Sequence, residues 1–593
     1  MTNKKLQKII FSSLALVLSF IIKIELVDEL LQIFSSFVLL EEEIKETINK
    51  LKQKNIINKH FLLCLMSISF IFLGHYILLL EFLIFYTLEE YIVEIFLDKA
   101  QDKNIKTLKK EREETTLKTV SGHVKIKWQD VKVGDILYIK KNEVCLIEGI
   151  LISENVSYKS FFEEDTKRII TGDNVPSGCI FESDALIKVE KTYESSFYNQ
   201  MIKRLENIEE NENIIGVKKI ENAFQKLFAV IILFYTFISI LYLKNNISFA
   251  ILILFSSFSL LIENNLLKLV KNTYFNSLIK MLKKGIYFTQ KNIFEKTKEI
   301  KIILFSKFGV LTKGELTVSK IIPVYKTKDE VLKIAAYLEY GSTHPMAKAI
   351  LKNYNKKIET ENIYLIEEIK GMGKKGIIEG MEVYIGNELL FDKLNITYPK
   401  VEFLEPTCML AIDNTYVATF VFNDIVKEDS YLVSSLLRET GIEKVVLFSS
   451  SKAEQIKKLG NNLSMNESYA ALTLEDKIEV LKMYKKEGQT MYVDAFLMNE
   501  EMKKNTDLSV LCGSSNNADI ILPDFDINNL VYIRKESLLL DKTLKIYLIS
   551  YFLIKLILFI FIITNILQIS TTMFIILIYY LILVVYSMKS LRS

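Results

Sequence analysis

The residue types that bind metal ions most readily are few in this sequence and stand far apart. The 593 residues include five cysteines and four histidines. No CxxC pair occurs and no two histidines stand three or four residues apart; the cysteines are at positions 64, 145, 179, 408 and 512. A zinc site or a disulfide framework normally shows such spacing. We therefore expect buried free thiols in a reducing compartment, and no histidine pair that binds a metal from one helix.

Four short segments contain glycine beside side chains that could do chemistry. Three of them have hydroxyl, acidic or histidine side chains, namely TGDNVP (171–176), SKFGVLT (306–312) and GSTHPMAKAI (341–350), and the fourth, GMGKKG (371–376), has lysines. Each has an ordinary structural explanation. Aspartate after glycine is usually a turn residue, His-Pro commonly begins a helix, and GxG is a weak turn signal. Ser306 opens the second segment, which contains neither a Ser-x-His pattern nor a carboxylate to activate the hydroxyl. Their meaning depends on the elements that position them.

The composition is typical of a membrane protein with large water-exposed parts, because half of the residues are apolar and a quarter are charged. Lysine and arginine outnumber aspartate and glutamate by only 75 to 72. The net charge therefore gives no reason to expect nucleic-acid binding. A chain of this length is expected to form several domains.

Apolar runs, some with polar flanks, predict eight membrane spans. They cover residues 7–24, 28–41, 60–74, 76–97, 225–243, 247–269, 544–564 and 570–588, and the second and third are short enough to be interfacial or tilted instead. The first run has no small-residue cleavage site, so we expect a retained span rather than a signal peptide. The distribution of lysines places both termini and both long polar inserts in the cytosol, and we expect the plasma membrane as the location.

The two polar inserts have different patterns. Residues 98–224 alternate apolar and polar residues in short segments separated by turns, which predicts a small antiparallel β domain. Residues 270–543 open with a buried-strand run at 300–306 and close with helix and strand alternations, which predict a parallel sheet with a site at its strand ends. Residues 322–418 carry a helix and strands of their own, so we expect a domain inserted in a domain.

These segments, in their order and spacing, resemble the heavy-metal-transporting (type IB) P-type ATPases along nearly the whole chain from the third span. TGDNVP is similar to the family's TGES-x-P loop, GSTHPMAKAI to SEHPLAKAI, FNDIVKEDS (422–430) to D-x-x-R-x-D-A, and LTLEDK (472–477) to P-E-D-K. The resemblance implies an α-helical membrane domain of about eight spans and a β-rich actuator domain. It also implies an α/β HAD-like phosphorylation (P) domain with an inserted α+β nucleotide-binding (N) domain.

The implied domain boundaries follow from the inserts. They are spans 1–4 at residues 1–97, the actuator domain at 98–224, spans 5–6 at 225–270, the P domain at 271–321 and 419–543, the N domain at 322–418, and spans 7–8 at 544–593.

The resemblance implies that ATP phosphorylates an aspartate in the motif DKTGT, that the glutamate of the TGE loop aligns the water that removes the phosphate, and that a CPC motif binds the metal. In this chain Ser306 stands at the position of that aspartate, and Phe308 and Val310 replace two threonines. A serine hydroxyl is not ionised at neutral pH and would form an inert phosphate ester rather than an acyl phosphate. The chain resembles a degenerate member that lacks the phosphorylated aspartate.

The family's Mg²⁺ ligands are also replaced. Its TGD motif falls on Ser449, Ser450 and Ser451. Its GDGxND hinge falls on VDAFLMN, where Phe496 marks a loss and Asp494 lies one position from the expected carboxylate. A shift of register by one would keep Asp494 as a degenerate metal position. Because positioned cations and donors carry most of phosphoryl-transfer catalysis, we expect impaired chemistry and no dependable Mg²⁺ site.

Two residues remain at catalytic positions of the family. Lys477 aligns with the phosphate-facing lysine of P-E-D-K, although a helical lysine is commonly a solvated charge, and both interpretations stay open. Asp173 replaces the TGE glutamate and keeps a carboxylate with one methylene less. Catalytic positioning is sensitive at the 1 Å level, so the shorter side chain also weakens the expected activity.

The metal gate in the sixth span is altered. Ser257, Phe258 and Ser259 stand at the CPC positions, and hydroxyls are poor ligands for the soft metals that thiolates bind. Phe258 also removes the helix break that a proline would make. Glu263 follows in the same run. It is either a functional intramembrane carboxylate or a residue that leaves the bilayer at the cytosolic end.

The N domain keeps most of its pattern. His344, Pro345, Gly371 and Gly373 stand where the family lines its adenine pocket, although Thr343 replaces a glutamate. The resemblance therefore implies ATP as a cofactor.

The leading interpretation is a catalytically impaired pseudo-pump in the lipid bilayer with a regulatory, binding or assembly role, for which the expected partner is an active transporter or another membrane protein. The alternative is an active, ATP-driven metal-cation translocating ATPase with unusual site residues. A passive channel or lipid-interacting scaffold is a third interpretation, which rests on the spans alone.

Overall fold

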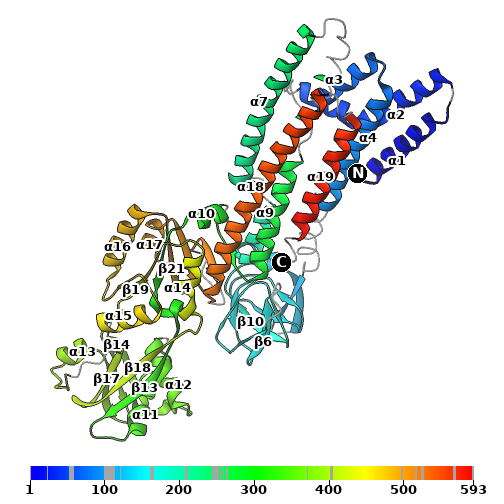
Figure 1. The fold of residues 1–593 in the computed structure, drawn as a ribbon. Coiled ribbons are helices and arrows are strands. Elements are labelled where there is room, and N and C mark those ends of the chain that lie inside the picture. Colours follow the sequence, from blue (N-terminus) through cyan, green and yellow to red (C-terminus); the bar gives the residue numbers. More distant parts are fainter. Residues whose placement is uncertain are drawn as a thin grey trace. The chain divides into compact units, whose positions relative to one another are not determined.

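The computed structural model (Figure 1) describes most of the chain. Outside the described residues lie 1, 23, 53–58, 99–113, 120–121, 161–165, 207–211, 243–252, 255–256, 258–259, 262–264, 291, 343, 370, 401–404, 496–497, 514–516, 523–525, 565–568 and 590–593. The chain separates into two compact units, Met1–Lys284 with Glu536–Ser593, and Gly285–Lys535. Each unit is described by itself.

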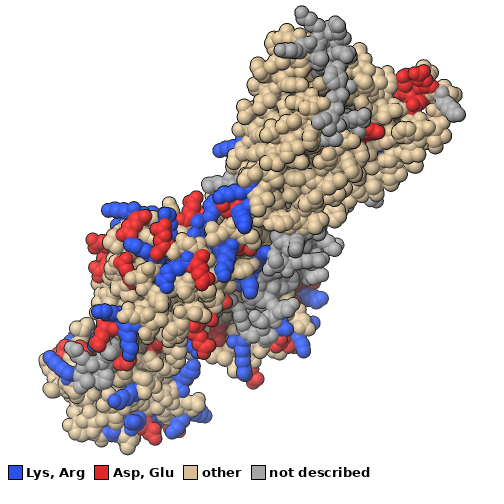
Figure 2. Space-filling model, in the orientation of Figure 1, with Lys and Arg blue, Asp and Glu red and all other residues tan. Residues whose placement is uncertain are grey.

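Long helices dominate the first unit because its apolar runs lack helix breakers. They are α1 (Thr2–Ser19), α2 (Glu25–Lys52), α3 (Lys59–Phe72), α4 (Tyr76–Val93), α7 (Glu212–Tyr242), α9 (Leu266–Lys283), α19 (Ile569–Lys589) and, from Glu536 onward, α18 (Asn528–Ile563). Many large apolar side chains point outward, including Leu227 at 61% and Ile549 at 65% exposure. On the face in Figure 2, charged residues are sparse over these helices and dense over the sheet-containing parts. An apolar exterior of this kind suits contact with lipid.

The predicted count of eight spans is not confirmed. Within the described residues, two helical segments are long and apolar enough to cross a membrane, Ile214–Leu241 and Asn528–Ile563. The apolar helices at Lys59–Phe72 and Thr571–Ser587 are shorter than a full span. In α2, the apolar run is bounded by Glu25 and Asp28 at one end and a row of glutamates at the other. Most of the predicted sixth span lies outside the described residues.

The polar insert of the first unit folds into two antiparallel sheets, which confirms the predicted β domain. The larger sheet has the order β2 (Gly122–Lys127), β1 (Glu114–Thr119), β3 (Ile136–Ile139), β10 (Ala185–Val189), β5 (Gly149–Leu151) and β8 (Asn174–Val175). The smaller has the order β4 (Val144–Cys145), β9 (Cys179–Phe181), β6 (Val156–Ser160) and β7 (Thr166–Ile169). Alternate residues such as Leu137, Ile139 and Ile187 are fully buried, as the period of two requires.

Two of the widely spaced cysteines meet in the smaller sheet. Cys145 in β4 stands directly opposite Cys179 in β9. Both are free thiols, as are Cys64, Cys408 and Cys512, and all but the half-buried Cys64 are buried. The expectation of buried free thiols is therefore confirmed for four of the five.

The second unit contains a seven-stranded sheet that is parallel except at β11. Its order is β11 (Tyr287–Phe288), β23 (Ile520–Leu522), β22 (Leu508–Cys512), β21 (Thr490–Ala495), β12 (Ile302–Ser306), β19 (Lys444–Phe448) and β20 (Glu467–Tyr469). The helices between these strands include α10 (Ile293–Glu299), α14 (Ser430–Glu439), α15 (Ala453–Asn462), α16 (Leu474–Glu487) and α17 (Glu500–Lys504). All five residues of β12 are buried, as expected for a central strand of a sheet covered on both faces.

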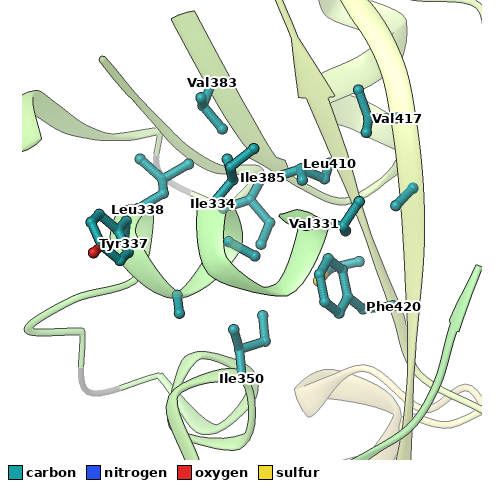
Figure 3. Packing of buried hydrophobic residues seen from close by; sticks show 14 of the residues in the cluster. Val331, Ile334, Tyr337, Leu338, Ile350, Val383, Ile385, Leu410, Val417 and Phe420 are labelled. Atoms are coloured by element: carbon teal, nitrogen blue, oxygen red, sulfur yellow. The ribbon is translucent and has the colours of Figure 1, made fainter. Parts of the chain in front are cut away.

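A six-stranded antiparallel sheet interrupts this parallel sheet in sequence. Its order is β13 (Thr312–Pro323), β18 (Thr415–Val426), β17 (Thr407–Ile412), β16 (Met381–Gly386), β15 (Gly373–Ile378) and β14 (Ile363–Ile369), with the helices α11 (Lys328–Leu338), α12 (Pro345–Tyr354) and α13 (Glu388–Lys393). The residues Val331, Ile334, Leu338, Ile350 and Phe420 pack α11 and α12 against the sheet (Figure 3). The insertion therefore has a hydrophobic core of its own.

The backbone of β16 packs closely against Gly373 in β15. Its φ is +153°, and a Cβ there would lie 2.1 Å from the carbonyl oxygen of Ile385 in β16. We expect Gly373→Ala to destabilise the protein by more than about 2 kcal/mol, because backbone rather than a movable side chain blocks the methyl group. Gly380→Ala is the matched control, since φ is +81° but nothing lies within 4 Å of the Cβ position; only the conformational cost of about 1 kcal/mol remains. Equal thermal unfolding midpoints of the two full-length variants in detergent would contradict this packing.

Candidate functional site

Three polar residues meet at the carboxyl edge of the parallel sheet. Ser306 ends β12, Ser449 follows β19, and Asp494 is the penultimate residue of β21. The register pairs Ser306 with Phe448 and Phe305 with Val493. Because parallel strands end at the same edge, residues more than a hundred positions apart become neighbours. The sequence predicted a site at this edge, and its function stays a prediction.

The Ser306 side chain is buried and engaged with β21. It is 8% exposed, and its hydroxyl lies close enough to Tyr492 and Asp494 to oppose the rise that burial causes in the pKa of each. The Asp494 carboxylate also accepts from the Tyr492 hydroxyl at 2.9 Å and from the backbone N–H of Ala495 at 2.9 Å. The sequence predicted Asp494 only as a degenerate metal position, because only the strand register reveals that this carboxyl lies beside Ser306.

The environment of Asp494 favours its protonated form. Burial raises the pKa of this carboxyl above its ordinary value, although the hydrogen bonds from Ala495, Tyr492 and Ser306 and the positive charge of Lys477 oppose the shift. Lys477 lies in the first turns of α16, which begins with a capping box between Thr473 and Asp476. The structure therefore brings Lys477 close enough to this edge for its charge to act on Asp494.

The loop after β12 keeps its shape through an internal ion pair. Gly309 adopts a φ of +74° within Lys307–Leu311. The ammonium group of Lys307 lies 3.7 Å from Asp424 and donates to the Ser451 hydroxyl at 3.2 Å. Burial lowers the pKa of Lys307 and raises the pKa of Asp424, while each charge opposes the shift of the other.

The donor set at this edge does not fit Mg²⁺, which prefers several carboxylate, phosphate or water oxygens in an octahedron. Serine hydroxyls stand at positions 306, 449, 450 and 451. The oxygens of Asp494 already accept hydrogen bonds. Asp424 has a buried Oδ1 without a hydrogen bond in the described part of the chain, but its other oxygen faces Lys307. The ammonium group of Lys307 therefore already occupies the position beside the Asp424 carboxylate. Phe496 lies outside the described residues.

Asp173 belongs to the first unit and forms a turn between β7 and β8. Its Oδ2 accepts from the backbone N–H of Ile170 at 3.0 Å, and its own N–H donates to the Ile170 carbonyl at 3.0 Å. Gly172 has a φ of +94°. This is the turn geometry that the residue types indicate on their own. The carboxylate is exposed, so a second role is sterically open.

The residues predicted to line a nucleotide pocket also have structural roles. His344 is the N-cap of α12, where its Nδ1 accepts from the backbone N–H of Met346 at 3.2 Å, and Pro345 is the first helical residue. Gly371 has a φ of +73° in the turn before β15, and its carbonyl accepts from the Asn387 side chain at 3.0 Å. Gly373 permits the close approach of β15 and β16. The helix-start and turn interpretations are confirmed, while ligand binding stays a prediction.

The predicted metal gate is only partly described. Ser257 is fully buried, and its hydroxyl has no hydrogen-bond partner among the described residues. Phe258, Ser259 and Glu263 lie outside the described residues. In the part of the chain that the structure describes, no group of three or more His, Cys, Asp or Glu residues could hold a metal ion.

Lys555 is a candidate functional residue in the helical part of the chain, and the sequence analysis did not predict it. It lies in the apolar part of α18, is 1% exposed, and donates to the Leu260 carbonyl at 2.6 Å and to the Tyr551 hydroxyl at 2.6 Å. Tyr551 in turn donates to Glu221 at 3.4 Å. A lysine in the middle of an apolar run is costly in lipid and marks functional sites, so its place in the predicted seventh span was the available signal.

Comparison with protein families gives two matches. Residues 300–495 match the haloacid dehalogenase-like hydrolase model, and residues 109–206 match the P-type ATPase actuator domain model. The first match covers the strands β12, β19, β20 and β21 of the parallel sheet and its insertion, and the second covers the two antiparallel sheets.

Several curated relatives are metal-transporting ATPases. The chain is 26% identical over 447 residues to a cadmium, zinc and cobalt-transporting ATPase of Bacillus subtilis, an alignment covering 72% of this chain and 62% of that protein. It is 23% identical over 516 residues to a cadmium, zinc and cobalt-transporting ATPase of Helicobacter pylori, covering 81% and 73%. A copper-exporting P-type ATPase B of Archaeoglobus fulgidus is 24% identical over 423 residues, covering 67% and 60%.

Two solved structures share the fold along the whole chain. One zinc-transporting PIB-type ATPase structure aligns with a TM-score of 0.58 at 17% identity, covering 99% of this chain and 100% of the other. A second structure of a zinc-transporting PIB-type ATPase, in a different state, gives a TM-score of 0.51 at 17% identity, covering 98% and 99%. The two domain models, the relatives and the shared fold together support the heavy-metal P-type ATPase family for this chain, and with it a membrane protein.

Proposed function

We propose that this protein is a catalytically impaired relative of the heavy-metal pumps that acts in the membrane as a binding, regulatory or assembly component, with an active transporter or another membrane protein as its partner. One observation carries the proposal. Ser306 occupies the end of the central strand, buried beside Tyr492 and Asp494, at the position where the resemblance implies an aspartate that accepts phosphate. A serine there forms no acyl phosphate.

The loss of Mg²⁺ ligands supports the same conclusion. Charge stabilisation by positioned cations and donors supplies most of the rate in phosphoryl transfer, and removing one such donor costs about 10²–10³ in rate. At this edge the ammonium group of Lys307 faces Asp424, and serines replace the aspartate of the family's DKTGT motif at 306 and the aspartate of its TGD motif at 451. Several losses act together, so one retained cation, Lys477, does not restore catalysis.

Nucleotide binding is the activity that we propose is retained. When ATP or ADP is bound, it supplies a purine base and phosphates for recognition. The segment of His344 and Pro345 and the turn of Gly371 to Gly373 keep a defined geometry that would hold the base. We expect ATP and ADP to bind the folded protein in the absence of Mg²⁺ and thereby to raise its melting temperature.

One observation favours the alternative of an active pump. Asp494 lies beside the Ser306 hydroxyl, which is the arrangement of a nucleophile and a base. In that alternative, the proton of Ser306 passes to Asp494 as the hydroxyl oxygen attacks the terminal phosphorus of ATP and ADP leaves.

Phosphorylation separates the two functions. We expect the purified full-length protein to incorporate no label from ATP labelled at the γ-phosphate, and to turn over below about a thousandth of the rate of an active metal pump assayed in parallel, because several donors are replaced together. Zn²⁺ or Cd²⁺ should not stimulate it. An acid-stable label, or metal-stimulated hydrolysis, that disappears in Ser306→Ala would refute the proposal and support the alternative.

The buried carboxyl of Asp494 predicts an unusual pH dependence. A carboxyl whose pKa is raised in the folded state contributes its stability below the unfolded pKa of about 4, and loses this contribution as the pH rises through the folded pKa. The neutral, nearly isosteric Asp494→Asn should therefore gain thermal stability relative to wild type between pH 4 and pH 7. Asp413→Asn is the control, since Asp413 lies in an exposed turn where it accepts from the Glu382 N–H. A difference between Asp494→Asn and wild type that does not change with pH would show that the carboxyl titrates normally.

A further inference from the structure

A buried ion pair joins the two segments that we propose to hold nucleotide. Lys374 follows Gly373 directly in β15, and Glu339 follows α11, five residues before His344. The Lys374 ammonium lies 3.2 Å from Oε2 of Glu339. Their side chains are 15% and 11% exposed, so the pair is largely removed from water. It bridges the glycine turn and the segment that leads to His344.

The alternation of β15 directs Lys374 inward. Gly376 lies on the same face of the strand, and a Cβ there would lie 2.8 Å from a methyl group of Leu338, the last residue of α11. Lys375 lies on the opposite face, where it pairs with Glu367 at 2.8 Å with side chains 40% and 64% exposed. Two adjacent lysines thus make one buried and one exposed ion pair.

Glu339 is the more constrained partner. Its Oε2 is buried and makes no hydrogen bond within the described part of the chain, so its charge is met by the ammonium of Lys374. A buried carboxylate is costly without a counter-charge or a hydrogen-bond donor. Either the lysine or a hydrogen-bond donor on a ligand can meet this need.

We propose that Lys374 occupies the base end of the nucleotide site and competes with adenine nucleotide for Glu339. This inference rests on the proposed nucleotide binding and specifies the residue that limits it. The exocyclic amino group of adenine is a hydrogen-bond donor that a carboxylate accepts, whereas a 6-oxo purine presents an acceptor at the same position and is repelled. The released Glu339 therefore selects 6-amino over 6-oxo purines.

The competition predicts that removing the ammonium strengthens binding. In full-length protein in detergent without Mg²⁺, we expect the ADP concentration that gives half of the maximal thermal shift to fall by at least about tenfold in Lys374→Val relative to wild type, with inosine diphosphate giving no such gain. Lys374→Met, which keeps more of the buried volume, should behave in the same way and covers the case in which the valine variant does not fold. Lys375→Val is the matched control and should bind as wild type does.

Each other result overturns the inference in a recognisable way. Weaker ADP binding in Lys374→Val than in wild type would make Lys374 a phosphate-binding residue. Equal binding in wild type, Lys374→Val and Lys375→Val would leave nucleotide binding intact and remove the competition. An equal gain with inosine diphosphate would remove the role of Glu339 in recognising the amino group. No thermal shift in any folded variant would overturn the proposed nucleotide binding itself.

Discussion

The burial of β12 is the constraint on which the catalytic half of the molecule depends. All five of its residues are buried, and it pairs in parallel with β19 on one side and β21 on the other. A strand in this position tolerates few polar side chains, so its last residue must either find hydrogen bonds or reach the open edge. Ser306 lies at that edge, 8% exposed, beside Tyr492 and Asp494. The strand register that would bring a phosphate acceptor close to its cation ligands here places Ser306 next to a carboxyl that already accepts a hydrogen bond from Tyr492.

Some residues that fix backbone geometry are kept and others are not. Gly309 keeps its positive φ and Gly373 allows two strands to approach, whereas Phe258 and Ser450 stand where the family has a proline and a glycine. Residues that would hold charge against phosphate or metal are replaced by hydroxyls and apolar groups. The pairing of Lys307 with Asp424 shows how the fold accommodates this change, because the positive charge of the loop is neutralised from within the protein.

The sequence was most informative where local chemistry determines structure. The run at 300–306 predicted a buried strand, His-Pro predicted a helix start, and the alternation in the first insert predicted antiparallel sheets, and the structure contains all three. Contacts that depend on register could not be predicted. The neighbours of Ser306 and the pairing of Cys145 with Cys179 join residues whose separation in sequence says nothing about distance in space. The span count was not confirmed because hydropathy does not distinguish a membrane span from a shorter apolar helix.

The way in which the antiparallel sheet joins the parallel one has an evolutionary consequence. Its first and last strands, β13 and β18, lie side by side, and Thr312 pairs with Val426 where they leave the parallel sheet (Figure 1). The chain therefore enters and leaves the insertion at nearly the same point, and the insertion has its own core. Such a module can be gained, lost or exchanged in a single recombination event without disturbing the host sheet, and it can keep evolving under its own selection after the host's chemistry has changed.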